Sequence, residues 1–358
     1  MSKTNKARVR LKDIAADLGL SVSAVSMALR EDASIPTETV KRVKEAAQRL
    51  GYAPDPALSA LAAYRSGLKV REDFNVIALV SDISPEGRWL SSNSAQKLIE
   101  GATERARTLG YTLQYFNAWN DGMTPQRLSK VLRARGVRGI IIGPMADPSA
   151  TLDMDWKRFS VVMVERAFQY GHFHHVVPNY YNDMMLVLHH LRAKGYKRPG
   201  MILYQSLAER VGHRWEAAYA VGWPEKTGDI PALILTPDML DGNVLDWFRR
   251  YRPDVIIGRG MLIMRTLEQA GIAVPGDVGY VALSALDEPA GVSGIIQHRD
   301  AIGAAAVDIL NSLLHRNHCG PNTISLGTHV DGTWHEGHTL RPTPVSLRAE
   351  IPSRAING

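Results

Sequence analysis

The sequence has a single cysteine, Cys319, among its 358 residues, so the chain forms no internal disulfide. Nothing therefore points to an oxidising compartment. The N-terminal residues MSKTNKARVRLKD lack the apolar stretch of a secretory signal, and no uninterrupted apolar run reaches the ~18–20 residues that span a bilayer. We expect a soluble, cytoplasmic protein that does not bind membranes.

The sequence also lacks the motifs of common enzymes. It contains no G-x-S-x-G, P-loop or H-E-x-x-H pattern, and Gly258-Arg259-Gly260 is too short for a dinucleotide fingerprint. We predict that the protein is not an enzyme and needs no cofactor or metal. Two histidine groups could bind a metal, although surface, loop or helix-end positions explain them better: His172, His174 and His175, and His315 and His318 beside Cys319.

Charge is unevenly distributed along a chain of otherwise average composition. The apolar fraction of 45% and the charged fraction of 22% exclude a mainly disordered chain. Residues 1–70 contain 12 basic and 7 acidic side chains, whereas the remaining residues contain 30 and 29. A basic N-terminal segment suits contact with phosphates, although a solvated helical surface would have the same composition.

Two short helical patterns near the N-terminus are separated by a glycine. In the first, an apolar face recurs at Leu11, Ile14, Ala15 and Leu18. Gly19 can adopt the left-handed conformation that ends such a helix, and Ser21 can cap a second helix over residues 22–29. This order predicts a helix-turn-helix, whose second helix enters the major groove of DNA. A generic helical hairpin with a serine cap is the alternative.

A third helical pattern ends at Gly51, and a domain boundary follows it. Its inward positions are Val40, Val43, Ala47 and Leu50. Pro36 and Thr37 compete for its start. Two prolines bar a helix at residues 53–56. The following stretch, residues 57–64, consists of good helix formers but is too short to be a stable helix without a packing partner.

From Phe74 onward, buried strands alternate with helices. Apolar runs predict strands at residues 76–80, 113–116, 139–142, 160–164, 199–203, 232–235, 254–257 and 278–283. Helical patterns lie at residues 95–109, 126–135, 184–194, 209–221, 245–251, 261–270 and 301–314. The alternation predicts an α/β fold of doubly wound parallel sheets, and the number of units predicts two lobes. Ligands bind outside the carboxyl ends of such strands, so paired lobes predict a cleft there.

Residues 9–65 contain the two segments LKDIAADLGLSVSAVSMAL and IPTETVKRVKEAAQRLGYAPDP. Through these segments, this part of the chain resembles the DNA-binding headpiece of the lactose-repressor (LacI/GalR) family of transcription regulators. Looser matches are GATERARTLGY, GVRGIIIGP, GIAVPGDVGYVAL and IIQHRDAIGAAAVDIL. The resemblance implies an all-α helix-turn-helix headpiece and a two-lobed, periplasmic-binding-protein-like α/β core. The expected domains are residues 1–54 for DNA binding, 55–73 for a hinge helix and linker, 74–342 for effector binding and dimerisation, and 343–358 for a C-terminal tail.

The resemblance also implies which residues contact DNA. They are Ser21, Val22, Ser23, Ser26, Met27 and Arg30 around the recognition helix, Thr39 and Tyr52 at positions that contact the DNA backbone, and Leu58 and Leu61 in the hinge helix. Met27 replaces the family's usual arginine and so removes a guanine reader, for which Arg30 is a possible substitute. Asp55 replaces a common asparagine, which weakens a phosphate contact. Leu61 or Leu58 would wedge into the minor groove, or both would pack the hinge helices together.

Candidate effector contacts follow predicted strands, at Trp89, Arg210, Arg214, Arg259 and Asp287. Trp89 could stack on a sugar or pack within a lobe. Arg214 resembles the position of a ligand-binding arginine in relatives, with Arg210 as its rival. Ser284 stands near the place where relatives have an acid, and Arg259 stands where many have an Asn-Asp pair. These departures suit a uronic acid or another anionic or sulfated sugar better than a simple hexose.

We therefore predict a ligand-responsive, DNA-binding transcriptional regulator, most simply a repressor of carbohydrate-related genes. Its expected partners are a palindromic DNA operator, a sugar or sugar-acid effector and a second copy of the chain. Prolines after Arg341 break any helical tail, which favours a dimer over a tetramer. Two alternatives remain. A solute-binding protein of a transport system would share the two-lobed core, and an enzyme could use the same architecture.

Overall fold

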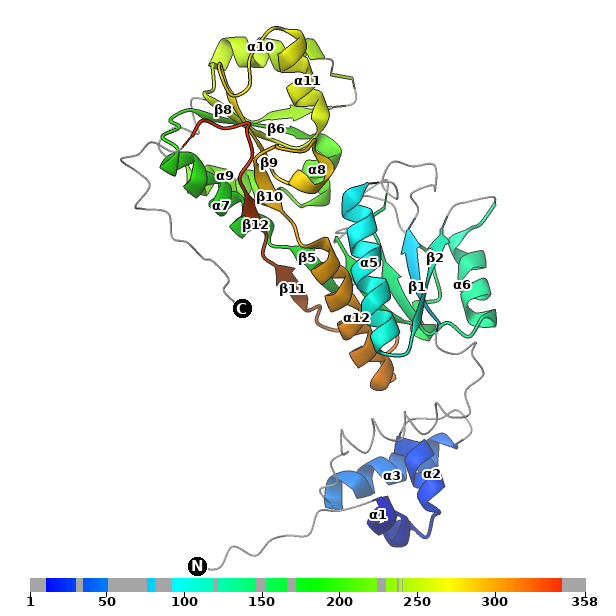
Figure 1. Cartoon of the computed structure of the whole chain (residues 1–358). Helices are drawn as coiled ribbons and strands as arrows, with labels where there is room; N and C mark the ends of the chain where they lie inside the picture. The colour runs from blue at the N-terminus through cyan, green and yellow to red at the C-terminus, as the bar shows by residue number, and fades with distance from the viewer. Residues whose placement is uncertain are drawn as a thin grey trace, which may run out of the picture. The chain divides into compact units, whose positions relative to one another are not determined.

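The structure is a computed structural model in which the chain forms two compact units, residues 1–73 and 74–358 (Figure 1). It describes residues 11–29, 35–50, 76–81, 92–118, 122–145, 152–165, 172–223, 230–236, 238–239 and 241–342. The expected hinge helix and linker at residues 55–73 and the expected tail at residues 343–358 lie outside this part of the chain.

The first unit contains three helices, α1 (Leu11–Leu18), α2 (Val22–Leu29) and α3 (Thr37–Leu50). Gly19 has a left-handed φ of 66° after α1. The hydroxyl of Ser21 accepts a hydrogen bond of 3.1 Å from the N–H of Ala24, which caps α2. The core that the helices share contains Ile14, Ala15, Val25, Ala28, Val43, Ala46 and Ala47. The predicted helix-turn-helix is confirmed in its helix bounds and in its turn.

The second unit contains two six-stranded sheets, and the sheet nearer the start of the unit defines lobe 1 (Figure 1). Its strand order is β11-β5-β4-β3-β1-β2, with all neighbours parallel. The strands are β1 (Val76–Ser81), β2 (Thr112–Asn117), β3 (Gly139–Ile142), β4 (Ser160–Val164), β5 (His174–Pro178) and β11 (Gly327–Val330). Helices α5 (Asn93–Thr108) and α12 (Arg299–His315) cover one face, and α6 (Pro125–Ala134) covers the other. A short 3-10 helix, η2 (Trp156–Arg158), precedes β4.

The second sheet defines lobe 2 and has the order β12-β10-β9-β8-β6-β7. Its strands are β6 (Pro199–Tyr204), β7 (Leu233–Leu235), β8 (Val255–Gly258), β9 (Gly279–Ala282), β10 (Gly294–Ile296) and β12 (Thr333–His335). One face of this sheet is covered by helices α7 (Tyr180–Ala193) and α9 (Arg214–Gly222), and the other by α10 (Asp241–Tyr251) and α11 (Met261–Gln269). Two short helices follow strand ends: α8 (Gln205–Arg210) after β6 and η3 (Ala285–Asp287) after β9. Of these strand pairings only β10 with β12 is antiparallel.

The chain passes between the lobes at three crossovers. The first lies at Asn179 between β5 and α7, the second at residues 297–298 between β10 and α12, and the third at residues 331–332 between β11 and β12. The inner strands of both sheets are buried on both faces, as expected for doubly wound parallel sheets, whereas the edge strands β2, β11 and β12 are partly exposed. The predicted fold class is therefore confirmed: an all-α headpiece followed by a two-lobed α/β core.

The eight strands expected from apolar runs are all present, and their ends differ from the prediction by no more than one residue. The prediction misses β5, β10, β11 and β12, each of which directly precedes or follows a crossover. The single helix predicted at residues 209–221 is wrong. Gly212 and His213 have positive φ values of 62° and 56°, so the chain turns there and forms α8 and α9 instead. None of the helices in the described part of the chain has the length and apolar content needed to cross a membrane.

Candidate DNA-binding and effector sites

The N-terminal tip of α2 presents three exposed side chains, Ser21, Val22 and Ser23. Val22 is 47% exposed although it is apolar. On the opposite face of the helix, Val25 and Ala28 are buried in the three-helix core. Core packing thus fixes the orientation of α2 and leaves its first turn open, as in helix-turn-helix proteins that read the major groove.

The remaining predicted DNA contacts differ in accessibility. Ser26 and Met27 are half-buried on α2, and Thr39 is half-buried in the first turn of α3. The guanidinium of Arg49 forms an ion pair with Asp17, which joins α3 to α1. Four predicted contacts lie outside the described residues: Arg30, Tyr52, Leu58 and Leu61. The structure therefore brings the exposed tip residues together and gives no position for the hinge leucines.

Three predicted effector residues are arginines that lie beyond the strands β6 and β8 of lobe 2. Arg210 ends α8, Arg214 begins α9, and Arg259 directly follows β8. Nη1 of Arg210 donates a hydrogen bond of 2.7 Å to the carbonyl of Met145, which lies just beyond β3 of lobe 1. The carboxyl ends of strands from both lobes therefore meet here, at the position where open α/β sheets bind ligands.

The buried ring of Tyr180 feels the charge of all three arginines. Tyr180 begins α7 and packs edge-on against Trp215, with ring centroids 5.1 Å apart. Burial raises the pKa of the Tyr180 phenol, while the positive charges of Arg259, Arg214 and Arg210 act to lower this pKa. A guanidinium affects a neighbouring pKa in this way when it lies close to the group. The charge of Asp183 acts in the same direction as burial, so the phenol stays neutral although the three arginines favour its ionised form.

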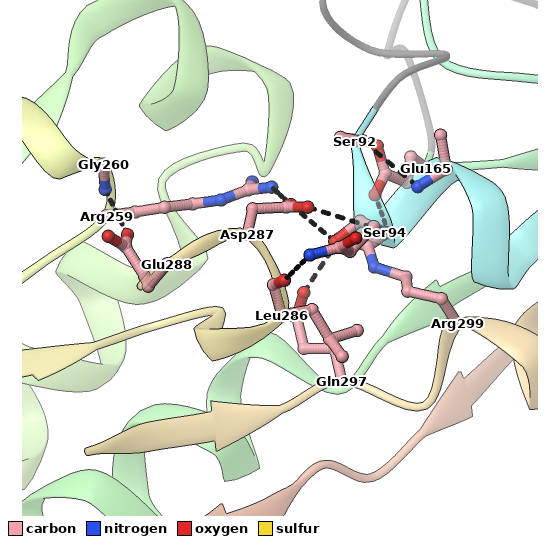
Figure 2. Close-up of polar contacts among 12 residues, drawn as sticks. Ser92, Ser94, Glu165, Arg259, Gly260, Leu286, Asp287, Glu288, Gln297 and Arg299 are labelled. Atoms are coloured by element: carbon pink, nitrogen blue, oxygen red, sulfur yellow. Dashed lines mark hydrogen bonds and ion pairs between the residues drawn. The ribbon is translucent and has the colours of Figure 1, made fainter. Parts of the chain in front are cut away.

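Asp287 connects this positive region to lobe 1 (Figure 2). Its carboxylate accepts hydrogen bonds from the N–H and the hydroxyl of Ser94, at 2.9 and 2.6 Å, in the first turn of α5. The same carboxylate lies 3.3 Å from Nη2 of Arg259. Beside this contact, the amide of Asn93 donates a bond of 2.8 Å to the carbonyl of Leu286. A carboxylate at a helix N-terminus is favoured by the helix dipole, so Asp287 both caps α5 and joins the lobes.

Two further polar groups lie at the same strand ends. Ser284 is fully buried after β9, and its hydroxyl has no hydrogen-bond partner among the described residues. The carboxylate of Glu288 accepts a bond of 2.6 Å from the N–H of Gly260, and burial raises the pKa of Glu288. Four of the five predicted effector residues, Arg210, Arg214, Arg259 and Asp287, thus lie in one region, and the fifth, Trp89, lies outside the described residues.

Asp183 joins the three crossovers, although nothing in its sequence context distinguishes it. It is buried on α7 and accepts bonds from the N–H of Gly332, at 2.9 Å, and from the amide of Gln297, at 3.2 Å. Gln297 in turn accepts a bond of 2.8 Å from Arg299, which forms a buried ion pair with Glu165 (Figure 2). Burial raises the pKa of Asp183 to about 6, and the two hydrogen bonds oppose this rise. A titratable carboxylate therefore lies among the three crossovers that connect the two lobes.

The first histidine group belongs to the start of β5. Nδ1 of His174 accepts a bond of 3.0 Å from the N–H of Leu326, and Nδ1 of His175 lies 3.3 Å from the hydroxyl of Ser325. These contacts engage the histidines with the chain segment that leads into β11. Within the described ranges, no three His, Cys, Asp or Glu side chains are grouped so that they could hold a metal ion.

Comparison with known proteins matches both units to family models. Residues 10–55 match the family described as bacterial regulatory proteins, lacI family. Residues 91–310 match the family described as periplasmic binding proteins and sugar binding domain of the LacI family.

Two curated relatives are regulators. The maltose regulon regulatory protein MalI of Escherichia coli is 30% identical over 57% of this chain and 58% of its own length, so the match spans less than two thirds of MalI. The HTH-type transcriptional regulator PtxS of Pseudomonas putida is 24% identical over 85% of this chain and 89% of its own length.

Solved structures show the same fold at low sequence identity. A complex of the transcriptional regulator CelR with cellobiose is 17% identical, covers 93% of this chain and all of that chain, and has a TM-score of 0.56. The lac repressor dimer bound to operator and an anti-inducer is 18% identical, covers 94% of this chain and all of that chain, and has a TM-score of 0.53. Since the sugar-binding-domain family alone matches more than half of the residues, the chain belongs to the LacI family of bacterial regulatory proteins.

Proposed function

We propose that the protein is a ligand-responsive transcriptional repressor of carbohydrate-related genes and acts in the cytoplasm. The observation that carries the proposal is the exposed, capped tip of α2 on a packed three-helix core. Serine hydroxyls can contact phosphates and base edges, and an exposed valine can pack against a thymine methyl group. The names of the curated relatives and the cellobiose in one related structure support a regulator that responds to a sugar-related molecule.

The proposed regulator binds a palindromic operator as a homodimer. Two-fold protein symmetry is matched by two DNA half-sites one or more helical turns apart. The related lac repressor structure, a dimer on operator DNA, supports this arrangement. In the proposal each tip of α2 reads one half-site, through Ser21, Val22 and Ser23.

The proposed effector binds between the lobes, at Arg210, Arg214 and Arg259. The bonds of Arg210 to Met145 and of Asp287 to Ser94 hold the lobes in one arrangement. A ligand that engages these groups competes with those bonds and so favours another arrangement, because a ligand shifts an equilibrium only by its different affinities for the two states. In the proposal this change alters the segment at residues 55–73, whose leucines would enter the minor groove.

A half-site experiment tests the symmetric mode of binding. The full-length protein is titrated against a duplex selected from genomic DNA and against the same duplex with one half-site scrambled, by fluorescence anisotropy at fixed salt. We expect at least tenfold weaker binding to the scrambled duplex, because one of two tips then lacks its base contacts. Equal affinity for both duplexes would contradict dimeric reading of a palindrome.

A further inference from the structure

We propose that the end of lobe 1 at which its parallel strands begin binds the phosphate backbone of DNA beside the operator, through Arg138, Lys157 and Arg316. This inference rests on the proposed function, since the headpiece first has to place the protein on DNA. It is carried by three observations: the three cations lie at one end of the sheet, they have no acidic partner among the described residues, and the headpiece is attached to this same end.

The three cations come from three elements that meet where the strands begin. Arg138 directly precedes β3, Lys157 lies in η2 just before β4, and Arg316 directly follows α12. The N–H of Ser160 in β4 donates a hydrogen bond of 2.9 Å to the carbonyl of Arg138, so the starts of β3 and β4 lie side by side. The guanidinium of Arg138 donates a bond of 2.8 Å to the side chain of Asn317, which follows Arg316. The three cations therefore form one group, the basic end of lobe 1.

Two further observations place the end of α12 over the starts of the strands. A Cβ atom added at Gly139, the first residue of β3, would lie 3.1 Å from the side chains of two leucines in the last turns of α12. Burial lowers the pKa of His174 at the start of β5, and the charges of His318 and Arg316 lower this pKa further. In Figure 1, α12 likewise ends where β1 begins. One histidine from each of the two groups in the sequence therefore lies at the basic end.

The charge of the basic end is not balanced by acids in the part of the chain that the structure describes. Acids on η2, α5 and α12 each pair with another arginine: Asp155 with Arg158, Glu104 with Arg107, and Asp308 with Arg105. By contrast, Arg138, Lys157 and Arg316 are exposed and form no ion pair with any described residue. Phosphates can approach such side chains without breaking an existing ion pair. Because duplex DNA carries one negative charge per about 1.7 Å of its axis, it suits a surface with several neighbouring cations.

The chain itself attaches the headpiece to the basic end. Residues 51–75 connect α3 to Val76, where β1 begins. Strand β1 is a neighbour of β3, and Ile77 pairs with Gly139, the residue after Arg138. When the tip of α2 binds a half-site, this connection holds the basic end close to the DNA beside the operator. A tethered second contact has a high effective concentration, so individually weak phosphate contacts add to the affinity.

Fluorescence anisotropy with two operator duplexes tests the proposal on the full-length protein. The short duplex contains only the operator selected from genomic DNA, and the long duplex adds about 15 base pairs of arbitrary sequence on each side, which is more than one helical turn. We expect the wild type to bind the long duplex at least about fivefold more tightly than the short one.

The triple variant Arg138→Gln/Lys157→Gln/Arg316→Gln should lose this advantage of the long duplex and bind the short duplex within about twofold of the wild type. The slope of log affinity against log salt on the long duplex should become shallower by about 2 or more, because each phosphate contact contributes about 0.9 to this slope. Scrambling the added flanks should leave the wild-type affinity unchanged, since contacts to phosphates carry no sequence information.

Lys197→Gln/Arg249→Gln/Arg265→Gln provides the matched control, because it removes the same charge from exposed side chains of lobe 2. This control should keep the wild-type advantage of the long duplex and the wild-type salt slope. Arg138→Lys/Arg316→Lys, which keeps both charges, should keep the advantage as well. Melting temperatures report a purely structural role, since cations near helix ends also stabilise helices. In that case the triple variant of the basic end melts at a lower temperature but keeps the advantage, which overturns the proposal.

The outcomes separate this inference from the proposed function. A wild type that selects its operator but binds long and short duplexes equally overturns the inference alone. The same holds for a folded triple variant of the basic end with wild-type affinity and salt slope on the long duplex, and the cations would then be left for another acidic partner, such as a protein surface. A wild type that does not distinguish the operator from a scrambled duplex of equal length overturns the proposed function instead.

Discussion

Replacing Ser23 with glutamate should lower operator affinity by about 100-fold, which corresponds to about 2.7 kcal/mol. Ser23 is exposed in the first turn of α2, at the tip that would enter the major groove. A carboxylate there would be repelled by the DNA phosphates and would remove a short hydroxyl from the base edges. The fold should tolerate the change, because an acid in the first turn of a helix is favoured by the helix dipole. Fluorescence anisotropy with a labelled operator measures the loss.

Lys44→Gln provides the matched control for this variant. It changes the net charge by the same single unit, and Lys44 is exposed on α3 rather than on the tip of α2. General electrostatics then predicts a loss of only a few-fold for Lys44→Gln, since a single distant charge contributes little at physiological salt. Circular dichroism shows whether the Ser23→Glu headpiece is folded. If a folded Ser23→Glu protein bound the operator with an affinity within threefold of the wild type, the tip of α2 would not be part of the DNA interface.

The Asp183 carboxylate should make the two-lobed unit lose stability as pH rises from about 4 to 7. The pKa of Asp183 is about 6 in the folded protein, against 3.8 for an ordinary aspartate, so the folded state binds this proton more tightly than the unfolded chain does. Its contribution to the free energy of unfolding is therefore fully present below pH 3.8 and is lost as pH rises through 6. Across this range the loss should be about 2–3 kcal/mol relative to Asp183→Asn, which does not titrate.

Urea unfolding followed by tryptophan fluorescence measures this difference. All seven tryptophans lie beyond residue 73, so the signal reports the two-lobed unit. An asparagine oxygen can still accept the bond from Gly332, which keeps that crossover contact in the variant. Asp246→Asn, a carboxylate with 81% of its side chain exposed on α10, is the control and should follow the wild-type pH curve. Parallel curves for the wild type and Asp183→Asn would show that Asp183 titrates normally.

The headpiece is predictable because its structure is local. The apolar positions of α1, the left-handed Gly19 and the Ser21 cap are all encoded within a few residues of one another. The buried strands of the core are predictable for the same reason, since each is a short apolar run.

The parts that resist prediction depend on contacts distant in sequence. Strands β10 and β12 have three residues each, and their paired residues are 37 or more positions apart in the chain. Within α8 and α9, the helical pattern continues through Gly212 and His213, and their left-handed backbone is what separates the two helices. The apolar periodicity does not show this break, although Gly212, like Gly19, is a residue that can end a helix.

In the effector region, too, local features can be predicted from the sequence and contacts between distant residues cannot. Arginines placed after strands can be read from the sequence, because parallel strands bring their carboxyl ends to one edge. The contact of Asp287 with the start of α5 in the other lobe could not be predicted from the sequence, since Ser94 lies 193 residues from Asp287. The burial of Asp183 could not be predicted either, because it depends on the crossover residues Gln297 and Gly332, which are distant in sequence and bond to its carboxylate.

Selection of genomic DNA fragments by the full-length protein tests the central claim most directly. The protein is mixed with fragmented genomic DNA at moderate salt and an excess of bulk polynucleotide, with and without a mixture of sugars and sugar acids. A truncated chain of residues 74–358 is treated in parallel. The account predicts that the full chain enriches a few fragments with a shared two-fold symmetric sequence, that a sugar or sugar acid changes this enrichment, and that the truncated chain enriches none. Recovery of fragments by the full chain with no preference over bulk polynucleotide, in either condition, would contradict it.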